Sequence, residues 1–439
     1  MPWYKDKILL LIALAAGTLK LAGFLYLFFF HPLGEQALIF PDSLGYIFPA
    51  QSWLTYGQFW EAVSSAPMVL PTPGYPFFLA LVHLFTGSST WGVVVTQNIL
   101  ATVLLLPVYL TTRELAGTHA ARWAAGFCAA STLYFSLAFA VLTETLCAFL
   151  LAWFVWAVAY WLNAKKPFYL AVAAVSLAGA IYVRPVVYYL MIPLSVVLLL
   201  TAPRPQRKPL LACFIAPLVL LVGAWHVRNY TQTGYAGFST VGAYNLYIWN
   251  EDYLARHLHI TVPQAHEQLL AQLPENFNQL SVPQQVRTYK NLAAPLLKQS
   301  FLDKLLHVPL WAGKTLLGTN FVHLSRLIFG QAEDPQQTLN QTGLLPRPWL
   351  QSAGAHLLWL GLLCGSILLA ICGGWGLIIL WKNNRQAALF LAGYIVYFWA
   401  LGSSFLGAYA RMRAPFEFAL CITAGICLHH QLSRQSSGR

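Results

Sequence analysis

The feature that most constrains this chain is a series of long apolar runs separated by short basic clusters. The clusters are Lys5–Lys7, Arg113–Arg122, Lys165–Lys166, Arg204–Lys208, Lys382–Arg385 and Arg434–Arg439. A helix needs about 20 mostly apolar residues to cross the hydrocarbon core of a bilayer, and the chain holds roughly ten such runs. Because lysine and arginine loops stay on the cytoplasmic side, the pattern predicts a polytopic membrane protein with these clusters on one face.

The composition supports the same class. Charged residues make up 9% of the chain and hydrophobic residues 58%, which excludes an ordinary soluble protein. The net charge of +12 is spread among apolar runs, so it forms no stripe of the kind that binds nucleic acid. Some cations nevertheless fall on predicted outer segments, namely Arg228, Arg256, Arg411 and Arg413. Arginine there suits an anionic partner that carries phosphate.

We expect an all-α fold with about ten transmembrane helices. The predicted spans are residues 8–30, 91–111, 120–139, 144–162, 168–183, 186–201, 209–226, 355–381, 386–402 and 414–430. An even number of spans places both basic termini in the cytoplasm. Two apolar pieces, 44–56 and 75–86, are too short to cross and are expected to lie flat at the interface.

The spans divide the chain into three parts. Residues 1–227 form an N-terminal transmembrane module that contains a first outer loop at 31–88. Residues 228–350 form a periplasmic loop with amphipathic helices, and residues 351–439 form the C-terminal helices. Residues 301–329 within the loop are amphipathic; a helix on the membrane surface is favoured there, and the sequence leaves a span open.

Two carboxylates open segments on the predicted outer face. Asp42 opens a segment just past the first span and is followed by Ser43, and Glu144 begins a span. Carboxylates near lipid are costly, so their presence indicates function. A general base must sit beside an acceptor hydroxyl, and Asp42 is the first candidate. The alternative is structural: an N-cap for Asp42 and a helix-dipole partner for Glu144.

Arginines occupy the same predicted face. Arg228 closes the seventh span, Arg411 and Arg413 open the tenth, and Arg184 lies at an outer turn. Snorkelling to lipid headgroups is one explanation, and paired arginines for a phosphate are the other. The histidines around His257 have no standard metal spacing. The sequence contains neither a phosphate-binding loop nor a dinucleotide motif.

Five sequence features, taken in order, resemble the GT-C superfamily of polytopic glycosyltransferases, closest to the bacterial branch related to protein O-mannosyltransferases and aminoarabinose transferase. They are Asp42-x-x-x-Tyr46, Thr72-Pro73-Gly74-Tyr75-Pro76, Glu144, Trp225-x-x-Arg228-Asn229-Tyr230 with Gly242-Ala243-Tyr244-Asn245-Leu246, and Arg411-x-Arg413-x-Pro415. The resemblance extends from the first span to the last. Two departures are Ser43, where relatives carry a second carboxylate, and Pro71, where branch members often carry arginine.

The resemblance implies a glycosyltransferase in the bacterial inner membrane. It would move a hexosyl or pentosyl unit from a polyprenyl-phosphate carrier to a lipid, glycan or protein acceptor on the periplasmic face, with inversion. Asp42 and Glu144 would be catalytic, and Arg228, Arg411, Arg413 and Arg184 would hold the donor phosphate. Tyr46, Tyr75, Tyr230 and Asn245 are candidate substrate contacts. The resemblance points to no definite cofactor and leaves a divalent metal open, although Ser43 stands where relatives carry the second carboxylate of a metal-binding pair.

Three other functions are compatible with a polytopic chain. A transporter for a small molecule or a lipid-linked glycan would place ionisable groups inside spans near broken helices, whereas here they gather at one face. A polysaccharide polymerase or ligase would also use outer arginines but would not need Asp42. A membrane scaffold would need neither set.

Overall fold

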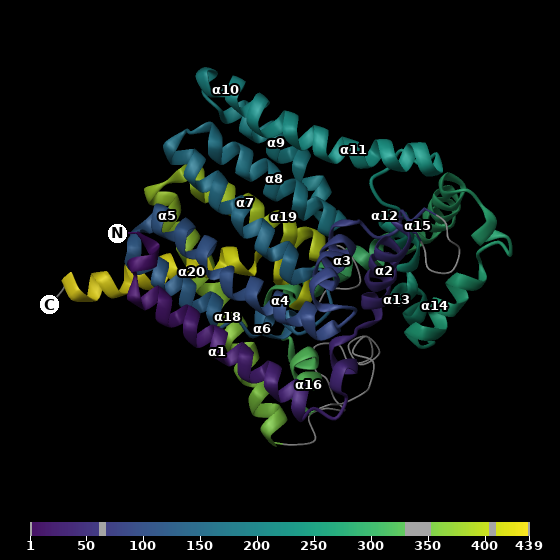
Figure 1. Ribbon diagram of the computed structural model, residues 1–439, viewed down its shortest axis with the longest axis horizontal. Coiled ribbons are helices and arrows are strands. Elements are labelled where there is room, and N and C mark those ends of the chain that lie inside the picture. The colour runs from purple at the N-terminus through teal and green to yellow at the C-terminus, as the bar shows by residue number, and fades with distance from the viewer. Residues whose placement is uncertain (1, 61–66, 330–352, 404–409, 438–439) are drawn as a thin grey trace.

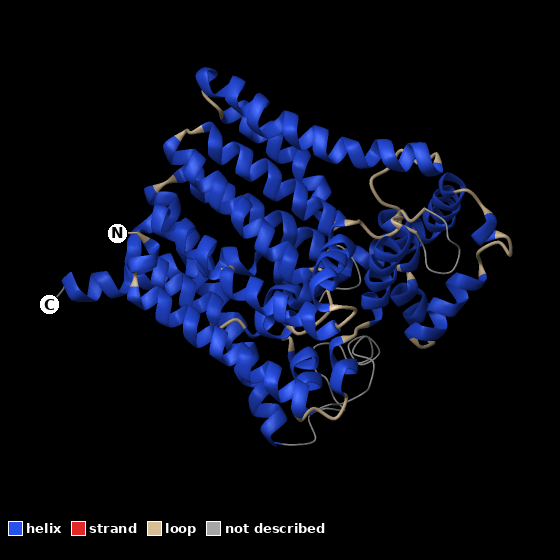
Figure 2. Cartoon of the chain, viewed as in Figure 1, coloured by secondary structure: helices blue, strands red, loops and turns tan. Residues whose placement is uncertain are grey.

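The computed structural model describes residues 2–60, 67–329, 353–403 and 410–437. Every regular element in these ranges is helical, as Figure 2 shows. The predicted all-α fold is therefore confirmed.

The N-terminal part is a series of helices that range from 7 to 25 residues in length. These elements are α1 (Lys7–Phe29), α2 (Leu44–Tyr56), α3 (Gly74–Thr86), α4 (Thr90–Val103), α5 (Leu105–Ala129), α6 (Thr132–Ala138), α7 (Glu144–Ala164), α8 (Pro167–Val183), α9 (Met191–Thr201), α10 (Arg204–Leu210) and α11 (Ala216–Thr233). The two short predicted pieces are both helices, α2 and α3. Asp6 caps α1, because its side chain accepts hydrogen bonds from the backbone N–H groups of Ile8 and Leu9.

The later elements comprise the outer segment and three C-terminal helices. They are α12 (Val241–Ile248), α13 (Glu251–Leu258), α14 (Val262–Ala271), α15 (Val282–Leu317), α16 (Phe321–Phe329), α18 (Ala353–Asn383), α19 (Arg385–Ser403) and α20 (Ala414–Ser437). A capping box at Ser281 and Gln284 starts α15.

Six helical stretches are long and apolar enough to cross a membrane within the described ranges. They are Lys7–Phe29, Thr90–Ala129, Glu144–Ala164, Arg204–Thr233, His356–Asn383 and Arg385–Ser403. The chain is thus a multi-pass membrane protein. The stretch Thr90–Ala129 contains the predicted span 91–111 and the first half of the predicted span 120–139, and Gly117 at φ 83° breaks α5 between them. The predicted total of ten spans stays a prediction.

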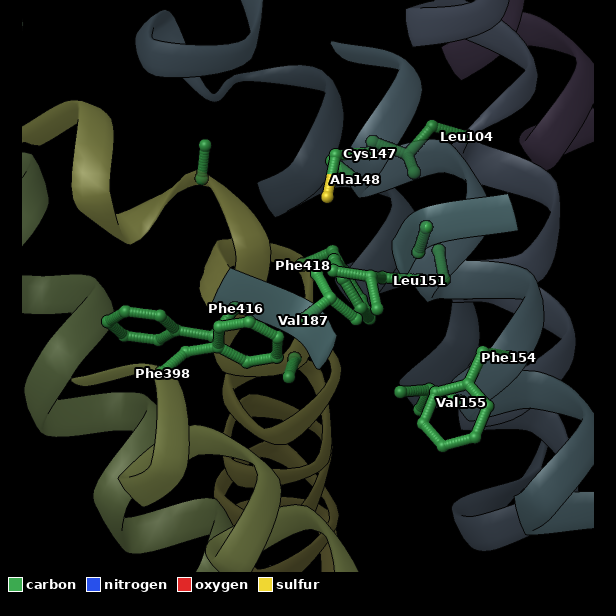
Figure 3. Packing of buried hydrophobic residues seen from close by; sticks show 14 of the residues in the cluster. Leu104, Cys147, Ala148, Leu151, Phe154, Val155, Val187, Phe398, Phe416 and Phe418 are labelled. Carbon is green, nitrogen blue, oxygen red and sulfur yellow. The ribbon is translucent and has the colours of Figure 1, made fainter. Parts of the chain in front are cut away.

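The largest core joins helices from both ends of the chain. In Figure 3, Cys147, Leu151 and Phe154 of α7 lie near Phe416 and Phe418 of α20. A close helix approach helps to form this core: a Cβ on Gly425 of α20 would lie 2.6 Å from the backbone nitrogen of Ala124.

The termini and the outer segment lie at opposite ends of the molecule. Figure 1 shows both termini at one end of the bundle, with α12, α13 and α14 at the other. A small second core, which includes Tyr247, Leu269 and Ala293, holds the outer segment together. The termini and α12, α13 and α14 are thus separated in the molecule, and the side of the membrane on which each lies stays a prediction.

Candidate active site

Asp42 is positioned by a short segment that is hydrogen bonded to the chain just before Glu144. The Ser43 hydroxyl accepts from the backbone N–H of Phe40 at 2.9 Å and donates to the carbonyl of Val141 at 2.8 Å. The backbone N–H of Val141 in turn donates to the carbonyl of Leu38 at 3.0 Å. These bonds bring the two outer carboxylates together although they lie about a hundred residues apart. Ser43 therefore has a structural role.

Glu144 is the first residue of α7, and its side chain is fully buried. Two arginines neutralise it. Arg184 lies 2.5 Å away from the Glu144 carboxylate, and Arg411 donates to the same oxygen, Oε1. A buried carboxylate with two cationic partners holds those cations in place. The geometry therefore makes Glu144 a positioning residue for Arg184 and Arg411, while its predicted catalytic role stays a prediction.

Arg411 connects the two carboxylates. Its Nε donates to Glu144, and its terminal Nη2 donates to Asp42 Oδ2 at 2.6 Å. The side chain of Asp42 is 41% exposed, whereas those of Arg411 and Glu144 are 10% and 0% exposed. The cluster of Asp42, Glu144, Arg184 and Arg411 thus presents one carboxylate to an approaching molecule. We call these four residues the charge cluster.

The Thr-Pro-Gly-Tyr-Pro motif fixes the place of Arg184. The Thr72 hydroxyl donates to the carbonyl of Val183 at 3.1 Å, and a Cβ on Gly74 would lie 2.6 Å from the carbonyl carbon of Tyr182. Only glycine allows this approach without a shift of the backbone. The motif therefore packs on the end of α8, directly before Arg184. Burial by itself would lower the pKa of Arg184, but the Glu144 carboxylate outweighs it and raises the pKa.

Two of the predicted substrate contacts, Tyr46 and Tyr75, lie beside the charge cluster. Their rings meet edge to face with centroids 5.2 Å apart. Burial, together with the charge of Asp42, raises the pKa of Tyr46 to about 12. Tyr75 is fully buried, and its hydroxyl donates to the buried amide of Gln97 at 2.7 Å. Tyr46 remains half-buried and is the better placed of the two for a ligand.

Arg413 points away from Asp42 and Glu144. It forms a buried ion pair with Glu417 at 2.6 Å and donates to the carbonyl of Leu316, also at 2.6 Å. Glu417 also accepts from Ser131. Arg413 thus ties the start of α20 to the end of α15, so its predicted phosphate contact has no geometric support. Arg411, two residues earlier in the sequence, is the arginine of this turn that enters the charge cluster.

Arg228 holds the first outer loop. Its guanidinium donates to the carbonyls of Met68 at 2.8 Å and Phe59 at 3.2 Å, and it lies 4.7 Å from the ring centroid of Trp225. Nearby Tyr230 is 63% exposed, and Asn245 on α12 is half-buried. The contacts of Arg228 are with this loop, so its predicted role as a phosphate ligand remains untested.

Sequence reasoning missed His323 on α16. Its ring stacks on Phe40 with centroids 4.9 Å apart, and Nδ1 is buried without a hydrogen-bond partner. Burial, together with the positive charge of Arg411, lowers the pKa of His323 to about 4. An imidazole whose Nδ1 has no hydrogen-bond partner thus lies within electrostatic range of Arg411 and Glu144. A lone histidine in an amphipathic segment gave no sequence signal for this.

No group of three or more histidine, cysteine or acidic side chains that could hold a metal occurs in the described part of the chain. The carboxylates of the charge cluster are paired with arginine.

Comparisons with known proteins agree with this fold. Residues 70–227 match the sequence model of the dolichyl-phosphate-mannose-protein mannosyltransferase family. The archaeal oligosaccharyltransferase AglB from Archaeoglobus fulgidus, solved with an inhibitory peptide and a dolichol-phosphate, superposes with a TM-score of 0.53 at 12% identity over 98% of this chain. Its apo form gives 0.55 at 14% identity over 99% of this chain. This chain covers 51% and 52% of those two chains, or about half their length.

ArnT from Cupriavidus metallidurans bound to undecaprenyl phosphate matches at 12% identity over 96% of this chain and 78% of its own. Its TM-score of 0.41 is too low to assign a shared fold. No curated protein sequence matches this chain significantly. AglB is a GT-C glycosyltransferase, so the chain has the GT-C fold and the predicted resemblance to that superfamily is confirmed. The bacterial branch stays a prediction.

Proposed function

We propose that the protein is a glycosyltransferase that moves a sugar from a polyprenyl-phosphate carrier to an acceptor on the outer face of the membrane. The observation that carries this proposal is the charge cluster, which joins a half-exposed carboxylate to buried arginines. The family match and the fold favour it, since AglB was solved with a dolichol-phosphate. The polyprenyl-phosphate donor, the acceptor and the side of the membrane on which transfer occurs are all part of this proposal.

The charge cluster offers the two groups that such a transfer needs. A hydroxyl of the acceptor attacks the anomeric carbon of the donor sugar, and Asp42 accepts the hydroxyl proton. The bond between the anomeric carbon and the phosphate oxygen breaks, and the electron pair leaves with the phosphate. A single displacement of this kind inverts the configuration. Asp42 suits the role because it is the exposed carboxylate of the four residues.

Arg411 and Arg184 suit the leaving phosphate. Guanidinium groups bind phosphate oxygens in a fixed, forked geometry, and Glu144 orients both arginines from a buried position. As negative charge grows on the leaving phosphate, fixed cations in a partly dry site stabilise it more than water does. Glu144 therefore acts through the arginines.

Tyr46 and Tyr244 both lie within electrostatic range of Asp42. Burial raises the pKa of Tyr244, and the charges of Glu251 and Asp42 raise it further. Tyr244 belongs to α12, so the outer segment reaches the same place as the first loop. The acceptor would enter between these two elements.

The direct test is transfer of labelled sugar from a polyprenyl-phosphate donor to acceptors in proteoliposomes. Wild-type protein should release polyprenyl phosphate and label an acceptor, and Asp42→Asn should not. Movement of intact donor across the bilayer without cleavage would instead indicate a transporter. Joining of whole lipid-linked glycans with turnover unaffected by Asp42→Asn would indicate a polymerase or ligase.

A further inference from the structure

Helix α15 has an inverted pattern of polarity over residues 300–311. The apolar side chains face outward: Phe301, Leu302, Leu305, Leu306, Val308 and Leu310 are all exposed. Two of them, Phe301 at 67% and Leu306 at 71%, are among the more exposed large apolar side chains. At 3.6 residues per turn these positions share one broad face. A helix of a soluble domain would turn this face inward.

The opposite face of the same turns is polar and packs against the outer segment. Lys304 donates to the side chain of Asn250 at 2.6 Å, and Asp303 pairs with Arg256 at 2.6 Å. Ser300 is fully buried and donates to the same Asn250 oxygen at 3.4 Å. These bonds fix the rotation of α15, so the apolar face cannot turn inward without breaking them.

The charge along α15 changes at the start of this face. Arg287, Lys290 and Lys298 are exposed on the N-terminal half of the helix, and the exposed apolar face begins three residues after Lys298. Cations next to an apolar face fit a membrane interface, where they meet anionic headgroups. The exposed face from Phe301 to Leu310 is about 14 Å long at 1.5 Å per residue. That is about half of the 30 Å hydrocarbon core.

We infer that residues 301–310 of α15 are immersed in the outer leaflet of the membrane, with Lys298 at its headgroups. The helix enters one leaflet and does not cross, which agrees with its absence from the six stretches that could span. The end of the helix then returns to the protein, where Trp311 is buried and Thr315 donates to the carbonyl of Gly402. The interior of this segment, including Arg256 and Asn250, is thereby fixed at the level of the membrane surface.

The test is photo-cross-linking in proteoliposomes that contain radiolabelled phosphatidylglycerol and phosphatidylethanolamine. A benzophenone amino acid replaces Leu306 in one variant and Leu302 in a second, so a folding failure at one position leaves the other. Lys290, on the same helix before the apolar face, is the matched control. We expect several-fold more lipid label at residues 306 and 302 than at residue 290.

Three outcomes would overturn the inference. Equal lipid labelling at residues 306 and 290 would mean that the apolar face does not enter the bilayer. A cross-linked band at twice the mass of the chain would assign the face to contact between two copies. Cross-linking within one chain would show that another segment of the protein covers it. The result does not depend on glycosyl transfer, so the proposed function stands or fails separately.

Discussion

Asp42 and Arg411 lie 369 residues apart in the sequence, and their side chains form an ion pair of 2.6 Å. The first outer loop and the last helix therefore meet at one point. Arg411 makes this contact while it is also bound to buried Glu144. The three residues should respond to substitution in three different ways, because one is exposed, one is buried and one connects them.

Replacement of Asp42 by asparagine should reduce turnover by about 10²–10⁴-fold, the usual contribution of a general base. Asparagine keeps the size of the side chain and its position on the surface, so folding and donor binding should change little. Sugar transfer under donor saturation measures this effect. The matched control is Glu267→Gln, since Glu267 is an exposed carboxylate on α14 of the outer segment. Near-normal turnover of the Asp42 variant would remove it as the base.

Replacement of Glu144 by glutamine should mainly harm the fold. The change leaves Arg184 and Arg411 largely buried without their shared counter-charge, and loss of one partner from a buried ion pair costs about 3–5 kcal/mol. We expect a lower midpoint of thermal unfolding in detergent and less folded protein in the membrane. A variant that folds normally but has lost turnover would contradict this view and restore Glu144 as a catalytic residue.

Replacement of Arg411 by lysine should weaken use of the donor. Lysine keeps the charge but cannot donate from a forked group to Glu144 and a second anion at once. Since a charge-assisted hydrogen bond contributes about 1.5–3 kcal/mol, the apparent KM for the donor should rise about tenfold or more. Arg287→Lys, at an exposed position of α15, is the matched control. An unchanged KM in the Arg411 variant would exclude it as a phosphate ligand.

His323 should make stability depend on pH. The pKa of His323 is about 4 in the folded protein, against 6.5 for an unperturbed histidine. On acidification the unfolded chain therefore binds a proton at a higher pH than the folded chain does. Stability is then full above pH 6.5 and falls between pH 6.5 and 4, by up to about 3 kcal/mol. His323→Gln should flatten the decrease in unfolding temperature across this range. An identical pH profile in the variant would show that other groups cause the decrease.

The side of the membrane can be tested at Gln285 in α15. A cysteine there should react with a membrane-impermeant maleimide in intact cells, because the basic clusters predict that residues 228–350 lie outside. The wild-type protein is the control, since its native Cys364 is exposed. Labelling that requires cell lysis would reverse the topology and the placement of the charge cluster.

The sequence predicted the helices better than the contacts. The bounds 44–56 were correct for α2, because an apolar stretch between Asp42-Ser43 and Gly57 leaves little choice. The kinked stretch Thr90–Ala129 was predicted as parts of separate spans, because the basic cluster Arg113–Arg122 marks the turn between them. Side-chain direction could not be predicted in the same way. Arg411 and Arg413 look equivalent in the sequence, yet a short 3₁₀ turn directs one to Glu144 and the other to Glu417.

The buried polar residues were the least predictable. Gln97 accepts a hydrogen bond from the Tyr75 hydroxyl, and His323 stacks on Phe40. Each pair forms only when segments distant in the sequence pack together. Neither residue stands in a motif. Their roles depend on tertiary packing, which local pattern does not encode.

The pairing of Asp42 with Arg411 also bears on how the molecule is made. A ribosome releases Asp42 and Glu144 into the membrane long before it translates Arg411. During that interval Glu144 has Arg184 as its cation, and Asp42 lacks this partner. The 3₁₀ turn Ala410–Arg413, which directly precedes α20, supplies the missing charge. A chain interrupted before this turn would therefore lack the Arg411 contacts to Asp42 and Glu144 that complete the charge cluster.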